Sequence, residues 1–115
     1  MRGDARACLH DIVQAADDIA EFTAVSFDAY VADKRARLSV ERQFTVIGEA
    51  LKALSRLEPA LLARLPTVSS MIAFRNILIH RYQAIDQSIV YQHARSSLPK
   101  LREAAAALLA ELDRG

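Results

Sequence analysis

The chain has 115 residues, of which 52% are hydrophobic, which is enough apolar material for the core of one domain. Fifteen Lys and Arg residues are balanced by fourteen Asp and Glu residues, which excludes a strongly basic protein that binds nucleic acid through its overall charge. Any affinity for nucleic acid must therefore come from a local basic patch.

The first predicted helix runs from about Asp4 to Ala24, because apolar residues recur there at helical spacing. We expect Cys8 to be a small buried residue on this helix, since a reactive thiol needs an exposed, basic setting. The neighbours Asp17 and Asp18 point about 100° apart, which indicates a solvated face and not a catalytic carboxylate pair. The apolar stripe comprises Leu9, Ile12, Val13, Ala16, Ile19, Ala20 and Thr23.

Two serines are predicted to cap the next helices. Ser26 would cap a short helix over residues 27–31. The cations of the following segment, residues 33–37, could contact phosphate, or the segment could be a solvated loop. Ser39 would cap a long helix with Glu41 in its first turn, where the helix dipole favours a carboxylate. The core stripe of that helix comprises Phe44, Ile47, Leu51, Leu54 and Leu57.

Prolines punctuate the second half of the chain. Pro59 interrupts the long helix, and Pro66 ends a short helical stretch over residues 60–65. The next helix should begin near Ser69 or Ser70 and run to about Tyr82.

The last predicted helix is capped by Asp86 and runs to about Leu112. Pro99 should bend it, because proline removes a backbone hydrogen bond and clashes with the preceding turn. No repeat or linker divides the chain. The sequence thus predicts one domain over residues 1–115 with an all-α fold, a bundle of four or five helices.

Most templates for a chemical site are absent from the sequence. It has no glycine-rich phosphate loop, no serine in a nucleophile-elbow context, and no Cys/His or His/carboxylate set with metal-ligand spacing. His10 and His93 are isolated, and each is expected to be a surface or packed residue. We therefore expect neither a metal nor a cofactor.

Residues 74–82 read Phe-Arg-Asn-Ile-Leu-Ile-His-Arg-Tyr, with polar residues interrupting an apolar helix at specific offsets. At about 100° per residue, Arg75, Asn76 and His80 fan over about 140° of one face, and Tyr82 lies about 20° from Arg75. This arrangement would present a cation, an amide, an imidazole and a phenol together. The residues expected to point toward the core are Phe74, Ile77 and Leu78.

These groups suit RNA cleavage without a metal. His80 could take the proton from a ribose 2′-hydroxyl or give one to the leaving 5′-oxygen. Arg75 offers a fork of N–H donors to the phosphate, and Asn76 could orient the imidazole. Because one histidine cannot easily do both tasks in one turnover, two copies at a symmetric interface would supply both. The alternative is that Arg75 and His80 are ordinary interhelical polar contacts.

At these residues the sequence resembles the HepT-like branch of the HEPN superfamily, whose motif reads Arg-x4-His-x-Tyr, usually with Asn after the Arg. The motif is complete from Arg75 to Tyr82 on the penultimate helix. Residues 26–27 (Ser-Phe) and 46–50 (Val-Ile-Gly-Glu-Ala) are also similar to the family. Ala73 and Ala84 depart from it, since family members often have glycine at both positions.

The resemblance implies a HEPN-type homodimer in which two copies of the motif form one ribonuclease cleft, with Arg75 and His80 catalytic. It also implies a toxin that acts on tRNA or mRNA and is neutralised by a minimal nucleotidyltransferase antitoxin, which transfers AMP to Tyr82. The alternative is a non-catalytic HEPN module that partners a nucleotidyltransferase or binds a nucleotide. The intact Arg75 and His80 favour the enzyme, and the near-neutral charge favours the module. A plain dimerisation domain would leave the polar helix face unexplained.

The location of the protein is also predictable. The N-terminal stretch carries charges at Asp4, Arg6 and Asp11, unlike a signal peptide, and no apolar run reaches the ~20 residues of a membrane span. The single cysteine cannot form an internal disulfide, which is typical of a reducing compartment. We therefore expect a cytoplasmic protein that does not contact a membrane.

Overall fold

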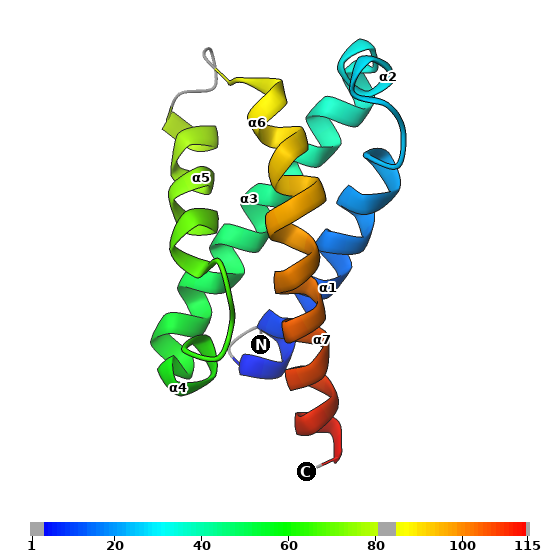
Figure 1. The fold of residues 1–115 in the computed structure, drawn as a ribbon. Helices are drawn as coiled ribbons and strands as arrows, with labels where there is room; N and C mark the ends of the chain where they lie inside the picture. The colour runs from blue at the N-terminus through cyan, green and yellow to red at the C-terminus, as the bar shows by residue number, and fades with distance from the viewer. Residues whose placement is uncertain (1–3, 81–84, 115) are drawn as a thin grey trace.

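A computed structural model describes residues 4–80 and 85–114, and this part of the chain is helical, without a strand. The prediction of an all-α fold is confirmed. A π-helical turn, His93–Ser97, joins the last two α-helices into one continuous column (Figure 1). The α-helices are α1 (Ala5–Phe22), α2 (Phe27–Ala32), α3 (Lys34–Leu57), α4 (Pro59–Leu62), α5 (Val68–His80), α6 (Gln87–Gln92) and α7 (Leu98–Arg114).

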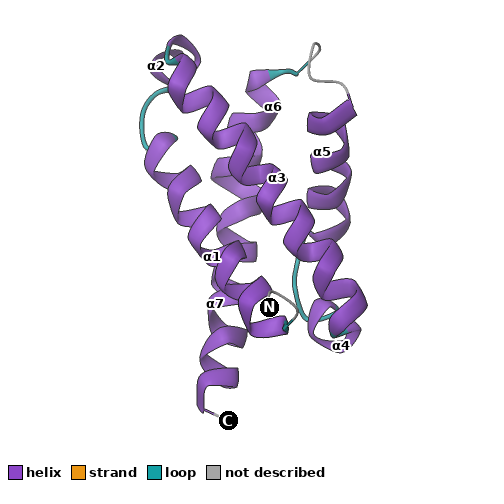
Figure 2. Cartoon of the chain, turned by 180° about the vertical axis from the view of Figure 1, so that it is seen from behind, coloured by secondary structure: helices purple, strands orange, loops and turns teal. Residues whose placement is uncertain are grey.

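Four helical columns form the bundle, with α3 running diagonally through it (Figures 1 and 2). Helix α3 packs against α1 and α5, and α1 also packs against α7. The short helices α2 and α4 lie at opposite ends, and both chain termini lie toward the α4 end. Among the helices that the structure describes, none is both long enough and apolar enough to cross a membrane.

The core is built from the predicted stripes. Each fully buried Leu, Ile or Phe side chain contributes about 1.5–3 kcal/mol relative to exposure. Two predicted members lie outside it: Leu57 is 40% exposed at the end of α3, and Ala20 is exposed on α1. Cys8 is buried on α1, as predicted. The largest buried side chains include Leu9, Ile12 and Ile19 of α1, Phe44, Ile47, Leu51 and Leu54 of α3, Met71 of α5, and Leu98 and Leu101 of the last column.

Helix α3 begins earlier than predicted. Asp33 caps it, because its carboxylate accepts hydrogen bonds from the backbone N–H groups of Arg35 (3.0 Å) and Ala36 (3.2 Å). Buried Ala36 and Val40 then continue the apolar stripe toward the N-terminus. The predicted cap at Ser39 is wrong, since Ser39 lies inside the helix. Most of the basic segment is therefore the first turn of α3 and not a loop.

The predicted cap at Ser26 is confirmed, since Ser26 caps α2 by accepting a hydrogen bond from the Ala29 N–H at 3.1 Å. The structure adds a cap at Asp4, whose carboxylate accepts from the Ala7 N–H at the start of α1. Helix α1 ends at Phe22, before the predicted Ala24, and the hydroxyl of its C-cap Thr23 donates to the carbonyl of Ile19. The helix ends thus follow local hydrogen bonds that hydrophobic spacing does not reveal.

Pro59 is the first residue of α4, where a missing N–H costs nothing. Helix α4 ends at Leu62, earlier than predicted, and Thr67 takes a left-handed backbone conformation (φ 61°) that turns the chain into α5. The predicted end of α5 at Tyr82 lies outside the described residues.

The last column accommodates Pro99 through the π-helical turn directly before it. Leu98 donates its N–H to the carbonyl of His93, five residues back, in place of the usual bond to the residue four back. This wider turn makes room for the ring of Pro99. Asp86 caps α6, as predicted, by accepting from the Ser88 N–H at 2.9 Å. Helix α7 then continues to Arg114.

A polar relay attaches the start of α6 to two other helices. The buried Tyr30 of α2 donates its hydroxyl to Gln87 Oε1 at 2.8 Å, and Gln87 Nε2 donates to Glu41 of α3 at 2.6 Å. Burial, with a smaller effect of the Glu41 charge, raises the pKa of Tyr30 to about 12, so the hydroxyl remains a donor. The chain is therefore anchored shortly after α5 ends.

Candidate functional site

Helix α5 lies at the edge of the bundle and packs mainly on α3. Its buried residues Met71, Phe74 and Leu78 span only about 60° of the helix. The predicted inward orientation of Phe74 and Leu78 is confirmed. That of Ile77 is wrong: its side chain is 43% exposed, because α5 packs mainly on α3 within the described part of the chain.

The outer face of α5 carries the predicted polar residues. Asn76 and His80 are both exposed, and His80 is the last residue of the helix. Ile77 and Ile79 are exposed beside them. The amide of Asn76 and the imidazole of His80 therefore lie beside exposed isoleucines on the open face of α5. Tyr82, the predicted AMP acceptor, lies outside the described residues.

Arg75 lies at the boundary between this face and the core, with only 13% of its side chain exposed. Its Nη2 donates to the carboxylate of Glu49 on α3, and its Nη1 donates to Asn76 Oδ1 at 2.9 Å. Its Nε is buried without a hydrogen-bond partner in the described part of the chain. Two fixed contacts thus hold the guanidinium at the junction of α3 and α5.

Asn76 has a different partner from the predicted one. We expected its amide to orient the imidazole of His80, but the hydrogen bond observed within residues 4–80 and 85–114 joins Asn76 to Arg75. Along α5, Arg75 and His80 are five residues apart, about 7.5 Å. The structure brings Arg75 and Asn76 together and leaves His80 open to solvent on the same helix.

Sequence reasoning missed Glu49 as the partner of Arg75. The available signal was Gly48, a glycine in the middle of a long helix, where it costs about 0.5–1 kcal/mol relative to alanine. Such a glycine indicates a close approach by another part of the chain, but the sequence does not say which part.

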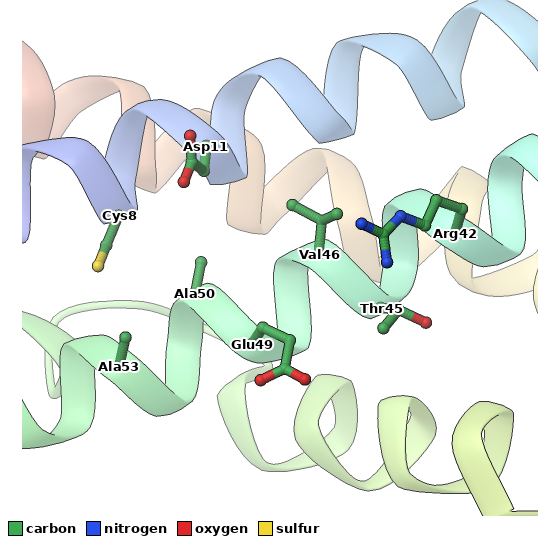
Figure 3. Close-up of a pocket in the computed structure, with 8 residues that line it drawn as sticks. All are labelled: Cys8, Asp11, Arg42, Thr45, Val46, Glu49, Ala50 and Ala53. Atoms are coloured by element: carbon green, nitrogen blue, oxygen red, sulfur yellow. The ribbon is translucent and has the colours of Figure 1, made fainter. Parts of the chain in front are cut away.

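A groove of about 310 Å³ between α1 and α3 adjoins this junction. Figure 3 shows Asp11 and Cys8 on the α1 side, and the Glu49 carboxylate on the side of α3 that faces α5. The exposed Arg42 also lines it, two helical turns before Glu49. The groove therefore carries both the carboxylate that pairs with Arg75 and a second cation.

The two remaining histidines of the sequence lie apart from this face. His10 is exposed on α1. His93 is half-buried, with its ring 4.6 Å from that of Phe74 and 6.5 Å from that of Phe44, centroid to centroid, and burial lowers its pKa. The described residues contain no group of three His, Cys, Asp or Glu side chains that could hold a metal ion.

Comparisons with known proteins agree on one family. Residues 12–108 match the family described as Ribonuclease HepT-like. The chain is 31% identical to a candidate RNase of Methanocaldococcus jannaschii, over 87% of this chain and 92% of the relative. It is 34% identical to a second one from the same organism, over 84% of this chain and 79% of that relative.

A candidate ribonuclease HepT from Thermococcus cleftensis is 31% identical over 82% of this chain and 86% of its own length. No solved structure matches the chain significantly. The family match covers most of the sequence, including the whole of α5 and the α3 segment that contacts it. The chain therefore belongs to the HepT-like ribonuclease family.

Proposed function

We propose that this protein is an RNA endonuclease whose chemistry is carried by Arg75 and His80, without a metal or a cofactor. One observation carries the proposal: α5 presents an anchored guanidinium and a solvent-open imidazole at its edge. Membership in the HepT-like ribonuclease family, and relatives that are themselves named as candidate RNases, support the same class of reaction.

The proposed reaction is an internal transfer within the RNA. One imidazole takes the proton of the 2′-hydroxyl, the 2′-oxygen forms a bond to phosphorus, and the bond to the 5′-oxygen breaks. A second, protonated imidazole gives its proton to the leaving 5′-oxygen. Arg75 donates N–H groups to the phosphate as negative charge builds on it. The products are a 2′,3′-cyclic phosphate and a 5′-hydroxyl.

A homodimer would supply the two imidazoles, and the outer face of α5 supports this part of the proposal. Ile77 and Ile79 are 43% and 36% exposed beside Asn76 and His80, so the apolar surface surrounds the polar groups that must meet. Pairing of two α5 helices about a two-fold axis would cover the isoleucines and bring both His80 rings into one cleft. Dimerisation would also add buried surface to a small domain.

We further propose that the protein is the toxin of a toxin–antitoxin pair and acts on tRNA or mRNA. A minimal nucleotidyltransferase would silence it by transferring AMP to Tyr82. If α5 continued in helical geometry, Tyr82 would lie about 20° from Arg75 around the helix. The added phosphate would compete for the arginine and repel the RNA backbone.

A second candidate function is a non-catalytic module that binds a nucleotide or partners a nucleotidyltransferase. Arg75 is already paired with Glu49 in the free chain, which favours a module that partners another protein, because any phosphate, of RNA or of a nucleotide, must compete with that carboxylate. The near-neutral charge of the chain favours it as well.

The two candidates are separated by incubating the purified protein with total RNA, alongside His80→Ala. We expect the parent to cleave RNA in the presence of EDTA, with cyclic-phosphate ends, and the variant to lose about 10²–10⁴-fold in rate. Cleavage at the parent rate by His80→Ala would refute the proposed role. Products with a free 3′-hydroxyl, or loss of activity on chelation, would refute the mechanism.

The antitoxin proposal needs its own test. We expect coexpression with a minimal nucleotidyltransferase to add the mass of AMP to a peptide containing Tyr82, and Tyr82→Phe to escape silencing. Equal silencing of Tyr82→Phe would leave masking by the partner as the mechanism of control.

A further inference from the structure

Gly48 lies where α5 crosses α3. Gly48 is buried. A Cβ atom added to it would clash with the Cβ of Arg75 and would lie 2.5 Å from its Cγ and 3.3 Å from its Cδ. These atoms are the base of the arginine side chain, which cannot swing away as a flexible tip could. A side chain at position 48 would therefore force α3 and α5 apart or expel the arginine stem from its path.

Glu49, the next residue, holds the other end of the same arginine. Its carboxylate lies on the α5 side of α3 (Figure 3) and accepts from Arg75 Nη2, while Asn76 accepts from Nη1. The side chain of Glu49 is 55% exposed and that of Arg75 only 13%. The stem of Arg75 is therefore buried against Gly48, and its head is fixed at the surface.

These contacts restrict the guanidinium to one orientation. A free arginine on a helix surface samples many rotamers and loses that freedom when it binds a phosphate. Here the stem already lies against α3, and the terminal nitrogens each keep a second N–H for a ligand. A group held in this way stabilises developing charge without reorganising at the moment of reaction.

We propose that Gly48 and Glu49 form a cradle on α3 that positions Arg75 for RNA cleavage. Gly48 gives the arginine stem its path, and Glu49 sets the orientation of the guanidinium. Both are positioning residues, since they act through Arg75. The catalytic consequence rests on the proposed ribonuclease function, whereas the close approach of Gly48 and Arg75 can be tested without it.

The first test uses the melting temperature of Gly48→Ala. At an ordinary helical glycine this change raises Tm, because alanine is the better helix former. The cradle predicts a lower Tm in the parent background, and a higher Tm when the same change is made in Arg75→Gly, where no side chain stands in the way. If Gly48→Ala alone fails to fold, recovery of folding in the double variant supports the cradle. A rise in Tm in both backgrounds, or no recovery, overturns it.

The second test separates positioning from plain structure through Glu49→Gln. This variant keeps an acceptor oxygen for the guanidinium but loses the negative charge, and with it the ion pair that holds Arg75. We expect kcat to fall several-fold while KM for RNA stays equal or decreases, since a negative charge beside the phosphate site is removed. Glu49→Ala should lower kcat further. An exposed carboxylate on another helix provides the matched control, Glu103→Gln, which should match the parent in both constants.

Unchanged kcat in both Glu49 variants would overturn the role of Glu49. A rise in KM with kcat unchanged would be the signature of lost binding and not of lost orientation. If the parent protein itself cleaves no RNA, the proposed function fails, and the melting temperatures in the two backgrounds still decide whether Gly48 accommodates Arg75.

Discussion

Arg75 shows how one residue can serve both packing and chemistry. Its stem is buried against α3, and its guanidinium donates to Glu49 and Asn76 at the surface. Each terminal nitrogen of the planar fork keeps one N–H for a ligand, and the fork matches the geometry of a phosphate. A lysine would carry the same charge without the fork.

We therefore predict that Arg75→Lys loses much of the cleavage rate although the charge is retained. Removing one donor to a developing oxyanion typically costs about 10²–10³-fold in kcat, and we expect that loss for Arg75→Ala, with Arg75→Lys in between. Rates measured on a labelled RNA under single-turnover conditions would test this order. Full activity of Arg75→Lys would mean that only the charge matters.

His93 predicts a pH dependence of stability. Burial beside the rings of Phe74 and Phe44 lowers the pKa of His93 below the ordinary 6.5, so the folded protein favours the neutral ring. Below pH 6.5 the unfolded chain therefore binds more protons than the folded protein. The contribution of neutral His93 to stability is present above pH 6.5 and is lost as the pH falls toward its lowered pKa in the folded protein. His93→Gln should weaken this loss.

Urea unfolding of the parent and of His93→Gln at pH 7.5 and pH 5.5 would measure the effect. The free energy of unfolding should drop more in the parent than in the variant. Equal drops would show that other groups account for the acid sensitivity.

At the scale of elements, α3 begins upstream of its predicted start because Asp33, and not Ser39, caps it. Asp33 bonds to two backbone N–H groups, and Ala36 packs in the core directly after it. We predict that Asp33→Ala costs about 1 kcal/mol of stability, the usual value for a lost N-cap, whereas Ser39→Ala costs less than about 0.5 kcal/mol. Chemical denaturation of the two variants would check this. A larger loss of stability for Ser39→Ala than for Asp33→Ala would show that Ser39, and not Asp33, stabilises the start of α3.

Helix α5 likewise depends on its neighbours. The spacing of α5 predicted its polar face correctly, but the width of that face was decided by tertiary packing, which is mainly against α3. Ile77 would be buried if a second element of the same chain covered the outer side. It is exposed here, and that exposed face is what a second copy could cover.

At the scale of the molecule, the dimer proposal predicts that Ile77→Asp produces a monomer. A carboxylate on the outer face of α5 would have to be buried against its own two-fold copy, at a cost of several kcal/mol per ion. The variant should scatter light as a 12.7 kDa species and lose cleavage. Leu112→Asp is a suitable control, because Leu112 is 38% exposed near the end of a different helix, α7. A monomeric parent with full activity would exclude the composite cleft.

Much of this protein could be read from its amino-acid order. Helical periodicity, helix caps at Ser26 and Asp86, and scarce glycine determined an all-α bundle. The spacing from Arg75 to His80 placed both on one helix, and the pattern of the motif indicated the HepT-like family, which the comparisons confirm. These are local properties, because they depend on residues within a few turns of one another.

Only the tertiary structure decided which partners those residues have. Glu49 is 26 positions from Arg75 in the sequence, and Gly48 meets the arginine stem only because α3 and α5 cross at that point. The same crossing left Ile77 exposed and turned Asn76 toward Arg75. Helical spacing sets the direction of each side chain from its own axis, but the relative placement of two axes comes from core packing summed over the whole chain.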